Sequence, residues 1–195
     1  MNHYGLDPVW YFSAPGLGWD AALKIIKVQL ELLSDPDMLL MIESGIRGGI
    51  ATISHRHAKA NNEYMGTEFD PTNDSKFISY LDANNLYGWA MSKQLPTSGF
   101  EWMTDDELDD WKHLSCFLEV DLEYPKDLHE LHNYPLAPER AKIGNIERLI
   151  PNLNNKTNYV VHYETLKLYE SLGLKITNIH GGIKFKESAW LKKIH

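Results

Sequence analysis

Hydrophobic and polar residues repeat with two different periods along the chain, and these periods separate expected helices from expected strands. Apolar residues three or four positions apart predict a helix over Leu17–Leu33. Pro36, which suits a first helical turn, predicts a second helix after Asp35, with Gly45 as its C-cap. Strict alternation over Cys116–Tyr124 predicts a half-buried strand, with Leu, Val and Tyr on one face and acids on the other.

Shorter apolar runs predict the remaining elements. Expected strands cover Ile50–Ser54, Lys76–Asp82, Tyr159–His162, Leu174–Ile179 and Ile183–Phe185, and Gly181-Gly182 is expected to turn between the last two. Expected helices start at Leu86, follow a Thr104 cap through Asp105–Trp111, and cover Glu164–Leu172. Because helices and strands are mixed without strict alternation, the sequence predicts an α+β (mixed α/β) fold.

The amino-acid composition is typical of an ordinary folded domain. Hydrophobic residues make up 43% of the 195 positions, which is ample for a core. The single cysteine, Cys116, excludes an internal disulfide framework and is more typical of a core residue than of a nucleophile. No apolar run approaches the roughly 20 residues that cross a bilayer, and the first residues do not resemble a signal peptide. We therefore expect an intracellular protein, nuclear or cytoplasmic, that is neither secreted nor bound to a membrane.

The net charge of −8 is unevenly distributed. Residues Glu101–Glu130 contain eleven acids and two lysines, whereas the rest of the chain is nearly neutral. Such a charged run is usually a solvated face, although it could also bind a basic partner. Ser44–Asn62 is locally basic, because Arg47, Arg56 and Lys59 occur there without an acid. A nucleic-acid partner is therefore compatible with the negative total.

Asp82 is the acid with the clearest argument for a metal ion. It ends an expected strand and precedes the helix expected from Leu86. A carboxylate there can hold a cation, and the backbone N–H groups at a helix start can accept the phosphates of a ligand. Strand, Asp, turn and helix also occur in many α/β proteins, where the Asp merely caps the helix.

Arg47-Gly48-Gly49 is the second candidate. Two glycines after an arginine let a phosphate or another backbone approach closely, although the same residues could be a simple turn. Two histidine pairs, His55-x-His57 and His129-x-x-His132, lack the further ligands that zinc requires.

Three blocks of the sequence together resemble one family. Asp82-Ala83-Asn84-Asn85-Leu86-Tyr87 is similar to the first palm motif of family B DNA polymerases, D-x-x-S-L-Y-P. Arg47-Gly48-Gly49 resembles the Y-x-G-G element of the protein-primed branch, and Tyr163–Phe185 resembles that branch's strand–helix–strand unit before the fingers. The chain is most similar to polymerases of Polinton/Maverick-type transposons and their viral relatives. It departs from the motifs at Ile46, Asn85 and Gly88, where the family usually has Tyr, Ser and Pro.

The resemblance implies an activity and assigns roles. It implies a DNA-directed DNA polymerase that transfers nucleotides from dNTPs to the 3′-hydroxyl of a DNA primer–template with Mg²⁺, with a terminal priming protein as a further partner. Asp82 would be the catalytic carboxylate, and Asp82 with the Ala83 carbonyl would bind the metal. Ala83, Leu86 and Tyr87 would bind the nucleotide, with the Tyr87 ring under the sugar unless it is an ordinary core aromatic. Arg47, Gly48, Gly49, Arg56 and Lys59 would contact DNA.

The resemblance also predicts an organisation for the chain. It implies an exonuclease-to-palm connector at 1–75, the first palm motif at 76–96, an insertion-like acidic segment at 97–157, and a strand–helix–strand unit leading to the fingers at 158–195. The motifs K-x-x-x-N-x-x-Y-G and D-T-D do not occur in these 195 residues, and we expect them beyond His195. The chain then resembles a central palm fragment that is inactive alone.

Two other functions stay open. The chain could be a non-catalytic nucleic-acid-binding or protein-interaction remnant of a transposon polymerase. A metal-dependent nuclease would need a second carboxylate beside Asp82, and the sequence offers no obvious one.

Overall fold

A computed structural model of the chain describes residues 4–194. It confirms a mixed α+β fold. The helices are α1 (Ala14–Ile26), α2 (Pro36–Gly45), α3 (Leu86–Met91), α4 (Asp105–Asp109) and α5 (Tyr163–Ser171). The strands are β1 (Leu95–Trp102), β2 (Cys116–Glu123), β3 (Glu139–Ile143), β4 (Ile146–Ile150), β5 (Lys156–His162) and β6 (Lys175–Ser188). Short 3₁₀ turns cover Pro8–Trp10, Glu63–Glu68, Trp111–His113, Lys126–Leu128 and Trp190–Ile194.

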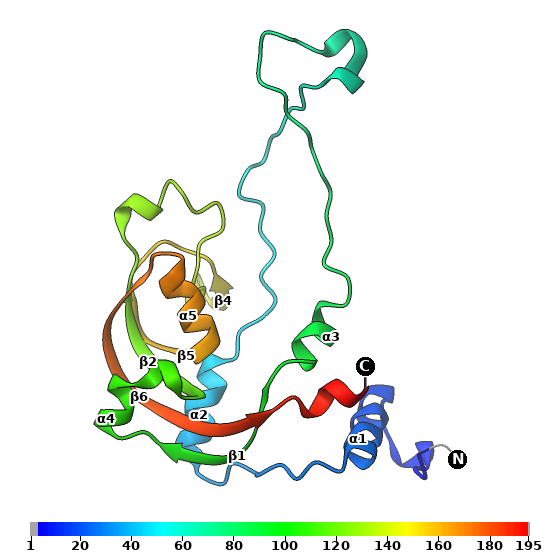
Figure 1. The fold of residues 1–195 in the computed structure, drawn as a ribbon, viewed down its shortest axis with the longest axis vertical. Helices are drawn as coiled ribbons and strands as arrows, with labels where there is room; N and C mark the ends of the chain where they lie inside the picture. The colour runs from blue at the N-terminus through cyan, green and yellow to red at the C-terminus, as the bar shows by residue number, and fades with distance from the viewer. Residues whose placement is uncertain (1–3, 195) are drawn as a thin grey trace. The chain divides into compact units, whose positions relative to one another are not determined.

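The chain divides into two compact units. Unit 1 comprises Met1–Arg47, Asn85–Pro125 and Asn154–His195, and unit 2 comprises Gly48–Asn84 and Lys126–Leu153. Unit 1 contains the helices and a four-stranded sheet, and unit 2 contains the β3–β4 hairpin and the loop of residues 61–76 (Figure 1).

The sheet of unit 1 has the order β1-β6-β2-β5, and every neighbouring pair is antiparallel. β5 and β6 therefore run parallel to each other with β2 between them, and α5 connects them. This is a split strand–helix–strand unit whose gap is filled by a strand from earlier in the chain. The alternation over Cys116–Tyr124 is confirmed, because Cys116, Leu118 and Val120 are fully buried.

The two faces of the sheet are covered by different helices of unit 1. Tyr159, Val160 and Val161 are consecutive in β5 and all buried, so both faces of this strand are covered. α2 packs on β5 closely enough that a methyl group at Gly45 would lie 3.0 Å from Val160 Cγ1. α5 packs on β5 and β2 and contributes the fully buried Leu166.

Several predicted helices are confirmed with shifted ends. α2 begins after Asp35, whose carboxylate accepts hydrogen bonds from two backbone N–H groups, and it includes Gly45, so that Ile46 is the C-cap. α4 has a capping box between Thr104 and Glu107. The helix predicted over Leu17–Leu33 was too long: α1 ends at Ile26, before Lys27 with φ of 55°.

Tertiary pairing explains the early end of α1. The backbone N–H of Glu31 donates to Thr97 O at 2.8 Å, and its carboxylate accepts from Gly99 N at 2.5 Å. Residues 27–35 thus run along β1 instead of continuing the helix, although their apolar residues keep a helical period.

Two strand predictions and one turn prediction were wrong. Ile50–Ser54 and Lys76–Asp82 lie within the described residues but form no strand, because neither finds a ladder partner there; only Lys76 makes an isolated bridge, to Asn61. The expected turn at Gly181-Gly182 is absent, since β6 runs unbroken from Lys175 to Ser188. The glycines instead sit beside β2, where a side chain on Gly182 would meet Leu118 Cδ2 at 2.8 Å.

Candidate functional site

Asp82 and Ala83 lie in an exposed, irregular stretch of unit 2. The Asp82 carboxylate has no hydrogen bond or ion pair to any residue that the structure describes. Its solvent exposure leaves it free to bind a cation, but nothing in the described chain holds it in place.

Helix α3 begins at Leu86, as predicted, and belongs to unit 1. Asn85 caps it in a left-handed conformation, with φ of 53°, and its Oδ1 accepts a hydrogen bond from Gly88 N at 3.3 Å. A side chain at position 88 would lie 2.6 Å from that same oxygen, so Asn85 and Gly88 require each other. The two departures from the polymerase motif therefore form one coupled local structure.

The start of α3 offers further exposed groups. Among the described residues, none accepts a hydrogen bond from the backbone N–H of Leu86 or Tyr87. Tyr87 is 87% exposed, so it is not a core aromatic in this structure. Because the boundary between the units falls between Asn84 and Asn85, Asp82 and Tyr87 are each described within their own unit.

A metal ion would need more ligands than these residues provide. Residues 4–194 contain no group of three His, Cys, Asp or Glu side chains close enough to hold one. Nucleotidyl transfer with two cations needs at least two bridging carboxylates. Asp82 alone therefore does not fit the complete magnesium site that the family resemblance implies.

Arg47 contacts both β5 and the end of α2 within unit 1. Its Nη1 donates to Val160 O at 2.6 Å and to Gly45 O at 3.1 Å. Its guanidinium carbon lies 3.8 Å from the centre of the Tyr159 ring, which is a cation–π geometry. These contacts connect Arg47 to residues of β5 that are more than a hundred positions away in the sequence, and they occupy part of its guanidinium group.

The other predicted DNA contacts are exposed residues of unit 2. Gly48 and Gly49 are exposed, and Gly49 has φ of 81°, a conformation that favours glycine. Arg56 and Lys59 follow in an exposed stretch without regular structure. These cations are accessible to a phosphate backbone.

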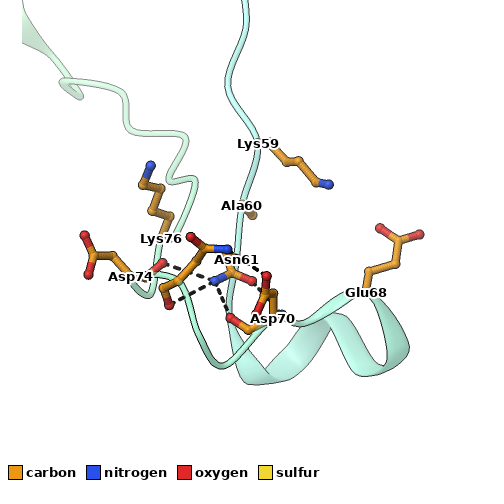
Figure 2. Close-up of a pocket in the computed structure, with 8 residues that line it drawn as sticks. Lys59, Ala60, Asn61, Glu68, Asp70, Asp74 and Lys76 are labelled. Atoms are coloured by element: carbon orange, nitrogen blue, oxygen red, sulfur yellow. Dashed lines mark hydrogen bonds between the residues drawn. The ribbon is translucent and has the colours of Figure 1, made fainter.

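A feature that the sequence reasoning missed is the loop of residues 61–76, organised around Asn61. Figure 2 shows the Asn61 amide inside the loop: its Nδ2 donates to the carbonyls of Asp70, Asn73 and Asp74, and its Oδ1 accepts from Asp70 N at 2.9 Å. Hydrogen bonds from Thr72 and Asn73 lower the pKa of Asp70. The run Asp70-Pro71-Thr72-Asn73 is a turn signal that could have indicated this loop.

The loop borders a pocket of about 290 Å³. Its lining includes Lys59 and Lys76 as well as the acids Glu68, Asp70 and Asp74 (Figure 2). Three loop carbonyls accept hydrogen bonds from the Asn61 amide nitrogen, so this arrangement stabilises the loop.

The acidic segment is partly neutralised by β6. Lys184 reaches Glu107 at 2.6 Å and Glu101 at 3.1 Å, and these contacts raise the pKa of Lys184 and lower that of Glu107. His180 pairs with Asp121 at 2.8 Å, and Lys175 with Glu123 at 3.3 Å. These ion pairs lie within unit 1 and involve four of the eleven acids of the segment.

Comparisons with protein-family models, with curated proteins and with solved structures find no match to the chain. Within the part of the chain that the structure describes, no helix is both long and apolar enough to span a membrane.

Proposed function

We propose that the chain is the palm-centred part of a protein-primed family B DNA polymerase of the transposon and viral type. In the complete enzyme, Asp82 would be one of the carboxylates that bind Mg²⁺, and Tyr87 would lie under the incoming deoxyribose. The basis of the proposal is the resemblance of three sequence blocks in their family order.

The observation that supports it best is the anchoring of Arg47 on β5. Arg47 belongs to the block that resembles the Y-x-G-G element, and Val160 precedes the block that resembles the strand–helix–strand unit. The 2.6 Å hydrogen bond from Arg47 to Val160 O, with the Tyr159 ring contact, links the first of these blocks to β5, the strand that directly precedes the other. A chance similarity of separate short motifs does not require such a contact.

Two features of the first palm block are compatible with nucleotide binding. The exposed Tyr87 ring offers an apolar face on which a sugar can rest, and the unused N–H groups of Leu86 and Tyr87 can donate to phosphate oxygens. Mg²⁺ would supply charge neutralisation at the phosphates when bound. Since Asp82 alone does not complete a two-cation site, we derive no catalytic step for the isolated chain.

DNA binding tests the proposal directly with the chain as it exists. Fluorescence anisotropy of a labelled DNA primer–template, titrated with the chain at several salt concentrations, gives both affinity and salt dependence. We expect weak, salt-sensitive binding, because Arg56 and Lys59 are exposed cations. Replacing both by Ala should reduce the slope of log K against log salt by about 1.8, since each phosphate contact contributes roughly 0.9.

The matched control removes two cations elsewhere. Lys112→Ala with Lys167→Ala changes net charge equally, and each lysine makes an exposed ion pair and a cation–π contact in unit 1. This control should leave the salt slope nearly unchanged. Equal losses in both double variants, or no binding at low salt, would contradict the proposed DNA contacts.

A primer-extension assay tests the catalytic half of the proposal. With Mg²⁺ and dNTPs the isolated chain should incorporate no nucleotide, because one carboxylate cannot hold two cations. Template-directed incorporation by this chain would refute our interpretation of Asp82.

A further inference from the structure

The segment Lys76–Asp82 exposes a row of large apolar side chains in unit 2. Phe77, Ile78, Tyr80 and Leu81 are 63–96% exposed. The backbone of Phe77–Asp82 makes no hydrogen bond to any residue that the structure describes. β-branched and aromatic residues in an unpaired extended chain form a template for pairing with another strand.

The start of this segment is fixed by the loop of residues 61–76. Asn61 and Lys76 exchange two backbone hydrogen bonds, of 2.7 and 2.9 Å, and the Tyr64 ring packs edge-on against Phe77 at 6.4 Å. Figure 1 draws the chain that leaves this loop as extended. In an extended chain, alternate residues point their N–H and C=O groups to opposite edges. The backbone N–H and C=O of Lys76 face Asn61. The backbone N–H and C=O groups of residues 77, 79 and 81 therefore lie on the opposite edge of the segment, where they can pair with another strand.

The sequence of this segment is complementary to itself. Lys76-Phe77-Ile78-Ser79-Tyr80-Leu81-Asp82, read against a reversed copy centred on Ser79, places Lys opposite Asp, Phe opposite Leu and Ile opposite Tyr. Opposite charges and aromatic–aliphatic pairs are the favourable cross-strand neighbours of an antiparallel ladder. Parallel pairing in register would instead place Lys76 on Lys76 and Asp82 on Asp82, which is repulsive.

We propose that two copies of this chain dimerise by antiparallel pairing of Lys76–Asp82, with the twofold axis at Ser79. Residues 77, 79 and 81 of each copy exchange backbone hydrogen bonds with residues 81, 79 and 77 of the other. A twofold contact uses the same patch on both copies and closes on itself, so the assembly ends at the dimer. The charge complementarity of the segment with its own reverse selects a second copy as the partner. This inference does not rest on the proposed polymerase function.

Disulfide trapping tests whether the twofold axis of the dimer lies at Ser79. In an antiparallel pair the two Ser79 Cα atoms would lie about 5.5 Å apart, within the range that a disulfide bridges. Ser79→Cys should therefore give a covalent dimer under mild oxidation. The native Cys116 does not interfere, because it is fully buried and burial raises its pKa to about 12.

Ser75→Cys is the matched control, since Ser75 is equally exposed and only four residues away. In the proposed dimer the two copies of residue 75 would lie about 26 Å apart, so no disulfide forms. Efficient linking at both positions would indicate random collision or parallel pairing and would overturn the proposal. Failure of Ser79→Cys to link would overturn it as well.

Charge exchange tests the register by sedimentation equilibrium. Lys76→Asp alone, or Asp82→Lys alone, places like charges opposite each other at both ends and should weaken dimerisation about tenfold. The double variant restores opposite charges and should recover the wild-type dissociation constant. Asn61 bonds only the backbone of Lys76, so these substitutions leave the loop closure intact.

Each remaining outcome is decisive. A wild-type chain that stays monomeric up to its solubility limit refutes the dimer and leaves this edge to a different partner. A dimer that the single charge reversals do not weaken places the interface elsewhere on the chain and also refutes the proposal.

Discussion

Replacing Arg47 by Met removes the guanidinium that holds the end of α2 to β5. Methionine keeps an unbranched aliphatic stem of similar length but cannot donate to Val160 O or Gly45 O. It also loses the charge that lies over the Tyr159 ring at 3.8 Å. The substitution therefore deletes the polar contacts while it retains part of the packing.

The expected loss can be worked out from these contacts. A hydrogen bond to a charged donor contributes about 1.5 kcal/mol or more, and Arg47 makes two to main-chain carbonyls at a half-buried position. A cation–π contact at such a position adds about 1 kcal/mol. We expect Arg47→Met to lower the unfolding free energy of unit 1 by about 4 kcal/mol, the sum of these contributions. Arg47→Lys, which keeps the charge but not the planar fork, should cost about half as much.

Urea unfolding followed by tryptophan fluorescence measures this loss selectively. All six tryptophans of the chain belong to unit 1, and Trp111 is buried there, so the signal reports this unit alone. Arg56→Met is the matched control, because Arg56 is an exposed arginine of unit 2. It should leave the midpoint of the fluorescence transition unchanged.

A loss below about 0.5 kcal/mol for Arg47→Met would match an ordinary surface substitution and refute the anchoring role. A double-mutant cycle that combines Arg47→Met with Tyr159→Leu should give a coupling energy of about 1 kcal/mol. Tyr159→Phe keeps the ring face, so Arg47 still lies over a ring in that variant and the corresponding cycle should give almost no coupling energy. Additive losses in the Leu cycle would show that the ring contact contributes nothing.

Two further predictions concern the sheet of unit 1. Gly182→Ala should lower the unfolding free energy by about 1–3 kcal/mol, because the added methyl group would meet Leu118 Cδ2 at 2.8 Å. Gly181→Ala is the control: its methyl group would enter open space, so it should lower the unfolding free energy much less in the same urea assay. Burial lowers the pKa of His162 below its ordinary value of 6.5, and its Nδ1 accepts a hydrogen bond from Glu164 N. The unfolded chain therefore takes up protons first, so stability should fall as pH drops below about 6.5. His162→Asn, which keeps a capping acceptor, should flatten this fall, and an unchanged pH dependence would contradict the assignment.

The sequence by itself determined the elements whose cause is local. Asp35 and Thr104 carry cap chemistry in their own side chains, and the alternation over Cys116–Tyr124 marks a strand with one buried face. The start of α3 was equally predictable, since Asn85 and Gly88 are close in the chain. Asp82 and Tyr87 became candidate site residues through the order of motifs along the chain, which also needs no tertiary information.

Only the tertiary structure decided where pairing partners exist. Lys76–Asp82 has the composition of a strand but pairs with no neighbouring strand within the described chain. Gly181-Gly182 has the composition of a turn but continues β6, because β2 pairs with it there. The helical period of residues 27–33 similarly yields to hydrogen bonds with β1. Arg47 was predicted as a DNA contact, and its attachment to Val160 and Tyr159 could not be predicted, because a contact across more than a hundred residues leaves no local periodicity. Strands and distant anchors depend on partners elsewhere in the chain, and only the fold brings those partners together.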